Sequence, residues 1–409
     1  MKISLSGPSD NLIKAHIKIT GSKSESNRSL LLASLYSGIT IENISNSDDA
    51  QVMTAGLKQS EGVVDIHHAG TAMRFLTGYF ASQEGKEVEL TGSKRMTERP
   101  VSVLVEALRS LGADISYVKD EGYPPLKIKG SKLIKDKVSL PADVSSQYIS
   151  SLLLIAPSLE NGLELELIGK ITSVPYIKMT LGLLNEIGVT TSFEGNTIKV
   201  SPKKEVDPIK LVVESDWSSA SYFYSIIALA ALGSEISLSS YKQSSLQGDS
   251  VLARLYMDLG VTTTFHKNTI TLKKVSESYP EQFQADLANA PDIAQTIAVT
   301  CFGLGIGCHL VGLHTLKIKE TDRLVALDTE LSKLGADISV TDKSLTLNSG
   351  RIIKEGIAID TYNDHRMAMA FAPLALKTSL FINDAEVVSK SYPDFWNDME
   401  LLQINVSEL

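Results

Sequence analysis

A short polar or charged cluster is followed directly by an apolar run at six places along this chain. The clusters are residues 21–28, 70–74, 145–147, 218–219, 291–292 and 363–366. The apolar runs that follow them are residues 30–36, 75–76, 149–156, 220–232, 293–304 and 367–376. A helix that is apolar on nearly every side must be buried. The pattern therefore predicts six buried helices, each with a polar N-terminus.

The clusters recur at a nearly constant interval. One marker per cluster gives Asn27, Thr71, Ser146, Ser218, Asp292 and His365, which are separated by 44, 75, 72, 74 and 73 residues. A second marker, a Leu-Gly or Ile-Gly pair after an amphipathic helix, falls at Gly112, Gly188, Gly260 and Gly335. Repetition at a fixed period indicates copies of one structural unit. We therefore predict six copies, the first cut short.

Each copy is predicted to run strand, helix, strand, turn, strand and buried helix. In the second copy these elements are strand 86–91, helix 101–111, strand 113–118, turn 120–125 and strand 126–129. The later amphipathic helices are predicted at 181–187, 252–259 and 324–334, and the hairpins at 191–200, 262–272 and 337–347. The first copy keeps only 52–58 and 63–66, so its hairpin is largely missing.

Local hairpins in a mixed sheet exclude a simple eight-fold βα barrel. We predict an α/β fold with two domains of three copies each, divided near Thr20 and Ser215. The first domain covers residues 20–215, and the second covers 1–19 and 216–409, with the strand at 1–8 joining the second. Helix N-termini carry partial positive charge. We expect them to face the cleft between the domains, where they favour an anion.

The first cluster carries two cations beside several hydroxyl groups. Lys23 and Arg28 are predicted to lie in a turn just before the helix at 30–36. An anion held at that helix N-terminus is one interpretation. An ordinary N-capped helix start is the other.

Composition narrows the class of protein. A chain of 409 residues with 43% hydrophobic and 21% charged residues is typical of a globular protein, and no apolar run reaches the ~20 residues of a membrane span. Cys301 and Cys308 match no common metal or redox spacing, which favours buried free thiols and a cytoplasmic location. The net charge of −9 argues against nucleic-acid binding. The lysines and arginines of the polar clusters are therefore expected to form a local basic site for a small anionic substrate.

The polar motifs, taken in order, resemble those of one enzyme family. They are Gly21-Ser-Lys-Ser-Glu-Ser-Asn-Arg28, Ala69-Gly-Thr-Ala-Met-Arg74, Arg95-Met-Thr-Glu-Arg-Pro100, Ser145-Ser-Gln147, Gln247-Gly-Asp249, Pro291-Asp292, Lys319-Glu-Thr-Asp-Arg-Leu324, Tyr362-Asn-Asp-His-Arg-Met-Ala-Met369 and Lys390-Ser-Tyr-Pro-Asp394. The family is 3-phosphoshikimate 1-carboxyvinyltransferase (EPSP synthase). The resemblance implies a two-domain inside-out α/β barrel of six β-α-β-α-β-β units, which agrees with the repeat.

The resemblance also implies an activity. The family transfers the enolpyruvyl group of phosphoenolpyruvate to the 5-hydroxyl of shikimate 3-phosphate and releases phosphate. Both substrates are anions, which Arg binds bidentately and Lys binds as a compact charge. The resemblance implies no cofactor and no metal, inhibition by glyphosate, and a monomer that binds neither nucleic acid nor membrane.

Site residues are carried over by motif position. For shikimate 3-phosphate the resemblance implies Lys23, Ser24, Arg28, Ser145, Ser146, Gln147, Ser173, Tyr176, Asp292 and Lys319. For phosphoenolpyruvate it implies Lys23, Gly70, Arg99, Gln147, Arg323, Arg366 and Lys390. His365 and Thr71 are assigned supporting roles, and Asp49 and Asp364 structural ones.

The reaction needs an acid for the methylene carbon and a base for the hydroxyl. Asp292, Glu320 and Lys23 are the candidates. Glu320 lies between Lys319 and Arg323, a like-charged i,i+4 pair that a bound anion would relieve if it lay on one helix face. A solvated helix start is the alternative for Glu320, and a plain N-cap is the alternative for Asp292.

Three positions depart from the common family pattern. His68 stands where Asn is frequent, Phe75 where Pro is frequent, and Thr315 where Asn often contacts phosphoshikimate. Gly70 is the small residue expected in glyphosate-sensitive members.

Two other functions stay open at this point. One is UDP-N-acetylglucosamine enolpyruvyltransferase, although the loop 92–99 lacks the Cys of that family. The other is a non-catalytic phosphoanion-binding protein. For the enzyme, we expect an open form that closes on phosphoshikimate.

Overall fold

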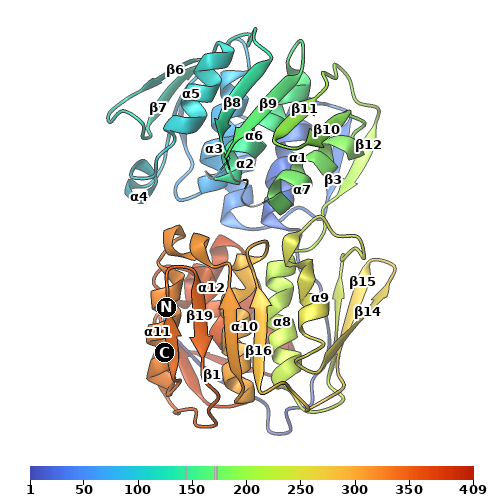
Figure 1. Ribbon diagram of the computed structural model, residues 1–409, viewed down its shortest axis with the longest axis vertical. Coiled ribbons are helices and arrows are strands. Elements are labelled where there is room, and N and C mark those ends of the chain that lie inside the picture. The colour runs from blue at the N-terminus through green and yellow to red at the C-terminus, as the bar shows by residue number, and fades with distance from the viewer. Residues whose placement is uncertain (143–144, 170, 172–173) are drawn as a thin grey trace. The chain divides into compact units, whose positions relative to one another are not determined.

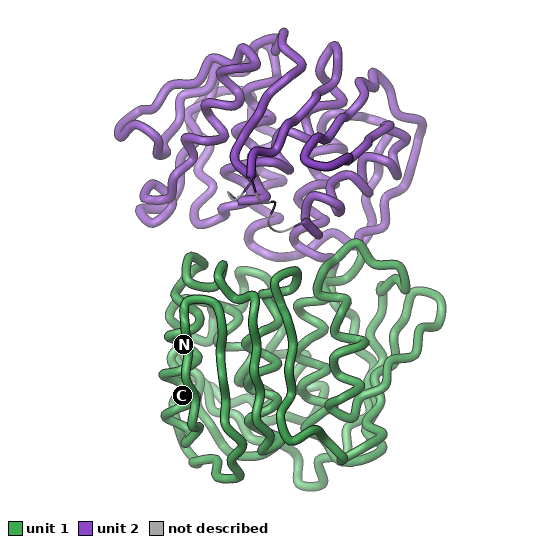
Figure 2. Tube along the Cα trace, viewed as in Figure 1, with its two compact units in different colours: residues 1–20, 214–409 green, residues 21–213 purple. Residues whose placement is uncertain are grey.

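The structure is a computed structural model that describes residues 1–142, 145–169, 171 and 174–409. The chain forms two compact units. Unit 1 is Met1–Thr20 with Glu214–Leu409, and unit 2 is Gly21–Val213 (Figure 2). The chain thus passes between the units twice, at 20/21 and at 213/214, and the sequence places these passages near Thr20 and Ser215.

The described residues of unit 2 form three sheets. Two have four strands, in the orders β4 (Glu61–Asp65), β5 (Glu87–Thr91), β7 (Leu126–Lys129), β6 (Asp114–Tyr117), and β10 (Thr191–Glu194), β11 (Thr197–Val200), β9 (Leu163–Ile168), β8 (Lys137–Pro141). The third is a parallel pair, β12 (Ile209–Val212) with β3 (Ile39–Glu42). This pair is the shortened first copy. The predicted strand at 63–66 pairs with β5, so it belongs to the sheet of the second copy.

The described residues of unit 1 form three sheets of four strands. Their orders are β14 (Val261–His266), β15 (Thr269–Lys274), β13 (Glu235–Ser239), β2 (Lys14–Ile17); β16 (Gln282–Asp286), β17 (Gly307–Val311), β19 (Ser344–Leu347), β18 (Ile338–Val340); and β20 (Ile357–Ile359), β21 (Leu380–Ile382), β1 (Ile3–Ser6), β22 (Asn405–Glu408). Each holds one parallel pair followed by antiparallel pairing, for example β16 with β17 and then β19. The same order in both units confirms the predicted repeat.

Helices of unit 2 are α1 (Lys23–Leu35), α2 (Asp48–Leu57), α3 (Gly70–Ala81), α4 (Lys94–Thr97), α5 (Ser102–Leu111), α6 (Ser146–Ile155) and α7 (Val174–Glu186). Those of unit 1 are α8 (Trp217–Leu229), α9 (Leu252–Leu255), α10 (Ala294–Leu304), α11 (Arg323–Leu334), α12 (His365–Phe371) and α13 (Phe395–Leu401). Within each unit the sheets lie outside the most apolar helices (Figure 1). Among the described residues, no helix has both the length and the apolar character to cross a bilayer.

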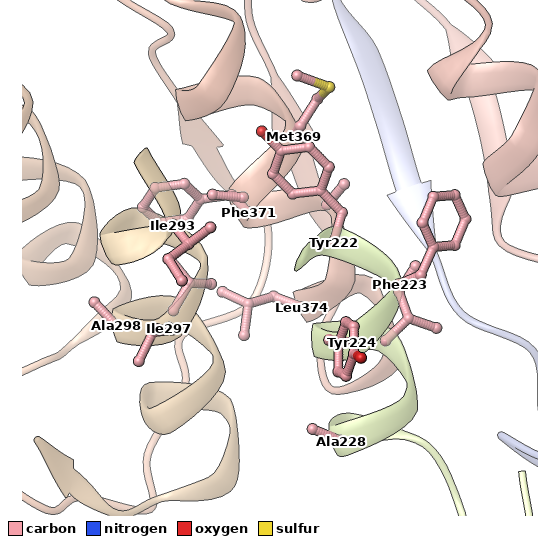
Figure 3. Packing of buried hydrophobic residues seen from close by; sticks show 14 of the residues in the cluster. Tyr222, Phe223, Tyr224, Ala228, Ile293, Ile297, Ala298, Met369, Phe371 and Leu374 are labelled. Atoms are coloured by element: carbon pink, nitrogen blue, oxygen red, sulfur yellow. The ribbon is translucent and has the colours of Figure 1, made fainter. Parts of the chain in front are cut away.

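The core of unit 1 is built where α8, α10 and α12 meet. Tyr222, Ile297 and Phe371, one from each helix, are fully buried and belong to the same apolar cluster (Figure 3). Cys301 and Cys308 are buried free thiols of this core, as predicted. In unit 2, α3 packs on α6 and α1, and these helices share a second apolar cluster. Burial of apolar surface stabilises the helix packing in both units.

Two local predictions are wrong. The helix predicted at 252–259 is α-helical only over Leu252–Leu255, after a 3₁₀ segment at Gly248–Val251. The turn predicted at 21–28 is the start of α1, so Lys23 and Arg28 are helical. Within α1 the polar residues 25–29 are all buried, whereas Leu30 and Leu35 are half-buried. The start of α1 therefore buries polar side chains, which is more typical of a ligand-binding site than of an apolar core.

Candidate functional site

Four of the buried helices leave one residue incompletely buried, and it is the second residue of each. These residues are Thr71 in α3, Gln147 in α6, Ser218 in α8 and Arg366 in α12. Every other residue of those four helices is buried. The helix N-termini thus present one polar side chain each to the outside of the core, with the free backbone N–H groups of the first turn around it. Each unit has such a face, and the two are described separately.

In unit 2, Arg28 is a buried cation with neutral partners. Its guanidinium donates to Thr180 Oγ1 at 2.8 Å, Ser150 Oγ at 2.9 Å and the Ser24 carbonyl at 2.7 Å. No described carboxylate lies within ion-pair distance of it. Burial lowers the pKa of Arg28 to about 10, so the group is still charged at neutral pH. A buried charge without a counterion is costly, and a bound anion would offset that cost.

The rings of Phe75 and Tyr176 lie beside this guanidinium. Their centroids are 5.2 Å and 6.0 Å from Arg28 Cζ. Phe75 lies inside α3, five residues after its first residue Gly70, so it does not displace the helix start. The ring takes the place of the frequent Pro and packs against the cation.

A second buried guanidinium, Arg74, lies beneath the start of α3. It donates to the carbonyls of Gly70 and Pro100, both at 3.2 Å. Burial, and next the charge of Arg99, lower its pKa to about 10. Arg74 ends the motif at residues 69–74, but no role was predicted for it. Two arginines close together, with no described carboxylate paired to Arg74, favour an anion here as well.

Gly70 makes room for the guanidinium of Arg99. A Cβ atom built on Gly70 would lie 2.6 Å from Arg99 Nη1. The absence of a side chain therefore lets the guanidinium lie directly against the N-terminus of α3. This arrangement brings together two residues predicted for phosphoenolpyruvate.

The remaining predicted groups of unit 2 lie on α1 and α6. Lys23 Nζ is 3.5 Å from Asp49 Oδ2. Gln147 Nε2 donates to Thr71 Oγ1 at 3.1 Å, so these two predicted residues are in contact, and the supporting role of Thr71 stays a prediction. Ser145 Oγ accepts from the Gln147 amide at 3.3 Å and caps α6. Ser146 is buried at the first residue of α6, and Ser173 lies outside the described residues.

In unit 1, Arg323 is held by three carboxylates. It is 1% exposed, so the charge must be balanced locally. Its contacts are Nε to Asp364 Oδ2 at 2.7 Å, Nη1 to Asp292 Oδ1 at 2.9 Å and Nη2 to Glu320 Oε2 at 2.8 Å. Arg323 therefore organises the acidic groups.

Asp292 is surrounded by cations. Besides Arg323, its carboxylate lies 3.4 Å from Lys319 Nζ and 3.3 Å from Arg366 Nη2. Burial alone would raise the pKa of Asp292, but Arg366, Lys319 and Arg323 hold it well below its usual range. The residue lies in the 3₁₀ segment Pro291–Ile293 and its side chain caps no helix, so the N-cap interpretation is wrong. Asp292 is an ionised acceptor at neutral pH.

Asp249 is a site carboxylate that the sequence analysis leaves without a role. It is buried and accepts a hydrogen bond from Ser218 Oγ, which also accepts from Arg366 Nη2 at 3.3 Å. Burial, and next the charge of Asp292, raise the pKa of Asp249 to about 7. Two carboxylates with oppositely shifted pKa values can divide acid and base work. The motif Gln247-Gly-Asp249 is the feature of the sequence from which Asp249 could have been predicted as a site residue.

Glu320 lies in a bend between the 3₁₀ segment His314–Ile318 and α11. The like-charged helical pair predicted for Lys319 and Arg323 is wrong, because α11 begins at Arg323. Asp322 caps this helix through the amides of Leu324 and Val325. The Glu320 side chain is 36% exposed, so its carboxylate can reach a ligand.

Thr315, in the adjacent 3₁₀ segment, has a buried Oγ1 with no hydrogen-bond partner among the described residues.

The segment before α12 supplies the last predicted groups. Asp364 accepts from the Arg366 amide at 2.9 Å and caps α12, which confirms its structural role. His365 is buried, with Nδ1 3.9 Å from Asp364 Oδ1. Lys390 Nζ donates to the carbonyl and to Oδ1 of Asn363, at 2.7 and 2.8 Å. The described residues contain no cluster of metal-binding side chains.

Sequence comparison identifies the family of this site. The sequence profile of EPSP synthase (3-phosphoshikimate 1-carboxyvinyltransferase) matches residues 9–62 and 58–399. The chain belongs to the EPSP synthase family. The 3-phosphoshikimate 1-carboxyvinyltransferase of Bacteroides fragilis YCH46 is 44% identical over 403 residues, covering 98% of this chain and 97% of that protein. The enzyme of the same name from Photobacterium damsela subsp. piscicida is 37% identical over 422 residues, with 96% and 97% covered.

Solved structures agree in fold. EPSP synthase from Acinetobacter baumannii superposes with a TM-score of 0.82 at 21% identity, covering 100% of both chains. The enolpyruvyl transferase NikO from Streptomyces tendae gives 0.74 at 12% identity, covering 99% of this chain and 98% of that one. The family resemblance and the two-domain α/β fold inferred from the motifs are thereby confirmed.

Proposed function

We propose that this chain uses the groups described above to transfer the enolpyruvyl group of phosphoenolpyruvate to the 5-hydroxyl of shikimate 3-phosphate. This is the reaction that its family catalyses. The observation that supports the assignment most directly is Arg28, a buried cation ringed by hydroxyl groups and without a described counterion. Such a group is stabilised by an anionic ligand with several acceptor oxygens.

Shikimate 3-phosphate is assigned mainly to unit 2. Arg28, with Ser24, Ser145, Ser146, Gln147, Ser173 and Tyr176, supplies charge and hydrogen-bond donors for its phosphate, carboxylate and hydroxyls. Asp292 and Lys319 contribute from unit 1. Asp292, which is ionised, accepts a hydrogen bond from the 5-hydroxyl and orients it for attack.

Phosphoenolpyruvate is assigned to the arginines and lysines of both units. They are Lys23 and Arg99, next to Gly70 and Gln147, and Arg323, Arg366 and Lys390. Planar guanidinium groups match its carboxylate and phosphate bidentately. Arg366 would contact both Asp292 and the ligand, because its Nη2 already lies beside the Asp292 carboxylate.

The chemistry proceeds by addition and elimination. The 5-oxygen bonds to C2 of phosphoenolpyruvate while the hydroxyl gives up its proton and the methylene carbon receives one, which forms a tetrahedral intermediate. The C2–O bond to phosphate then breaks, the methyl carbon loses a proton, and the double bond returns. Asp292, Glu320 and Lys23 are the assigned proton carriers, because each is an ionisable group at a position that the family resemblance assigns to the reaction. His365 orients Asp364 and the start of α12.

A phosphate-release assay with two acceptors tests the assignment. We expect release from phosphoenolpyruvate with shikimate 3-phosphate and none with UDP-N-acetylglucosamine. Release only with the nucleotide sugar would establish the rival transferase. Substrate binding without release from either would establish a phosphoanion-binding protein.

Glu320→Gln separates binding from catalysis. We expect it to keep substrate affinity within a few fold while turnover falls by about a hundredfold or more. The matched control is Glu355→Gln, an exposed glutamate of the same unit, which should retain full activity.

Three further properties belong to this proposal. Glyphosate should inhibit in competition with phosphoenolpyruvate, which steady-state kinetics at varied phosphoenolpyruvate will test. Sedimentation should give the mass of a monomer. Fractionation should place the chain in the cytoplasm.

A further inference from the structure

Two consecutive residues with left-handed backbone precede the helix that carries Arg366. Tyr362 has φ 53° and Asn363 has φ 58°, in the segment between β20 and α12. Residues with a side chain rarely adopt this conformation, and they keep it only where the surroundings hold them. The turn is followed at once by Asp364, His365 and Arg366. The direction of these side chains therefore depends on how firmly the turn is held.

The group that holds Tyr362 is Glu330 of α11. Its carboxylate is fully buried and accepts from Tyr362 Oη at 2.5 Å and from the Asp360 amide at 3.2 Å. Lys333 Nζ, one turn later on the same helix, lies 2.8 Å from both Glu330 oxygens and 2.7 Å from Asp360 Oδ2. Both oxygens of the buried carboxylate thus have a cation and a hydrogen-bond donor as partners, which offset its desolvation. No step of the proposed reaction uses it.

Glu330 and Arg323 hold the same segment from one helix. They are seven residues apart on α11, about two turns, which places both side chains on one face. Arg323 binds Asp364 at 2.7 Å, and Glu330 binds Tyr362 two residues earlier. On the far side of the turn, Lys390 Nζ donates twice to Asn363. Burial, and then Glu330, raise the pKa of Tyr362 to about 12, so its hydroxyl remains a donor at neutral pH.

We infer that Glu330 and Tyr362 are positioning residues for the reaction: their hydrogen bond fixes the left-handed turn that aims Asp364 at Arg323 and Arg366 at Asp292. Neither touches the reacting atoms in this scheme. Loss of the bond lets the turn relax toward ordinary backbone angles and moves the guanidinium of Arg366. The inference rests on the proposed function, because it concerns how accurately Arg366 meets phosphoenolpyruvate.

Tyr362→Phe is the decisive variant, since it removes one hydroxyl from a side chain that is 39% exposed and leaves the core intact. The matched control is Tyr224→Phe, which removes a hydroxyl bonded to Thr263 Oγ1 at 2.8 Å, elsewhere in unit 1. Steady-state kinetics of all proteins, with each substrate varied in turn, and amide hydrogen exchange of residues 360–366 are the two measurements.

We expect Tyr362→Phe to lower kcat/KM for phosphoenolpyruvate by about ten- to a hundredfold, with a much smaller change in KM for shikimate 3-phosphate. Exchange across 360–366 should quicken in the same variant and not in Tyr224→Phe. Glu330→Leu, which offers Tyr362 no acceptor, should lower the same kcat/KM and quicken the same exchange. The double variant should be no worse than Glu330→Leu, because both substitutions remove the hydrogen bond between Tyr362 and Glu330.

Wild-type kinetics in Tyr362→Phe, an equal loss for both substrates, or unchanged exchange would each overturn the inference. A wild-type protein that releases no phosphate would instead remove the proposed function. In that case the exchange measurement still decides whether Glu330 and Tyr362 hold the turn.

Discussion

Arg366 Nη2 lies 3.3 Å from Asp292 Oδ2, and Arg366 Nη1 donates to the backbone carbonyl of the same aspartate at 3.3 Å. The two residues are 74 positions apart, one repeat of the chain. The polar cluster that opens one buried helix thus binds the cluster that opens the next. The carboxylate belongs to the segment just before α10 and the cation to the first turn of α12, so an ion pair joins the starts of two successive buried helices.

Asp292→Asn should damage both stability and turnover. The substitution leaves Arg323 and Arg366 short of a counterion in a buried site, which typically costs about 3–5 kcal/mol of unfolding free energy. Turnover should fall by about a hundredfold or more, because the amide cannot accept the hydroxyl proton. Urea denaturation and phosphate release measure the two effects. Asp258→Asn, at an exposed aspartate of unit 1, is the control and should change neither.

Asp249 should impose a pH dependence on stability. Its pKa is about 7 in the folded protein against a usual 3.8, so the folded state binds the proton more tightly than the unfolded chain. The resulting stability is complete below about pH 4 and is lost as the pH rises through 7. We expect Asp249→Asn to flatten the change in unfolding free energy between pH 5 and 8, measured by urea denaturation. Parallel curves for the two proteins would contradict the assignment.

Arg28→Met should separate binding from folding. In the absence of substrate the free energy of unfolding should rise or change by less than about 1 kcal/mol, because the cation that is removed is buried and forms no ion pair with a described carboxylate. Thr180 and Ser150 keep a partner, since their hydroxyls lie 3.0 Å apart. The affinity for shikimate 3-phosphate should fall by about a hundredfold or more. Calorimetry checks both, and Arg109→Met, an exposed arginine of unit 2, is the control.

Gly70→Ala should act through Arg99. The added methyl group would stand 2.6 Å from Arg99 Nη1, so the guanidinium has to move away from the start of α3. We expect KM for phosphoenolpyruvate to rise by about tenfold and glyphosate inhibition to weaken, with little change in melting temperature. Gly350→Ala is the matched control, because nothing lies within 4 Å of a Cβ there. Unaltered kinetics would show that Arg99 is not a substrate contact.

Much of the architecture follows from short-range pattern. The interval of 72 to 75 residues between later clusters identifies the repeated unit, and the change from polar to apolar residues marks where each buried helix starts. Thr71, Gln147, Ser218 and Arg366 could be selected in this way, because helix capping and amphipathicity act within a few residues. The start of α1 was misplaced because its buried face is polar, and the pattern assumes apolar burial.

Other features come from contacts between segments far apart in the chain. Arg323 collects carboxylates from positions 292, 320 and 364, and no local pattern predicts that assembly. Glu330 is a charged residue of the helix predicted at 324–334, and no local pattern predicts its burial or its hydrogen bond with Tyr362. Arg74 and Asp249 stand in motifs, but their shifted pKa values depend on burial and on neighbouring charges.

The sequence by itself determined how often the unit recurs, most of the helices and strands, and the polar residues at the N-termini of four buried helices. Only the tertiary structure decided which charges are paired, such as Asp292, and which are buried without an ion pair among the described residues, such as Arg28. The reason is physical: secondary structure depends on neighbours within a few residues, whereas desolvation and Coulomb interaction depend on distance in space.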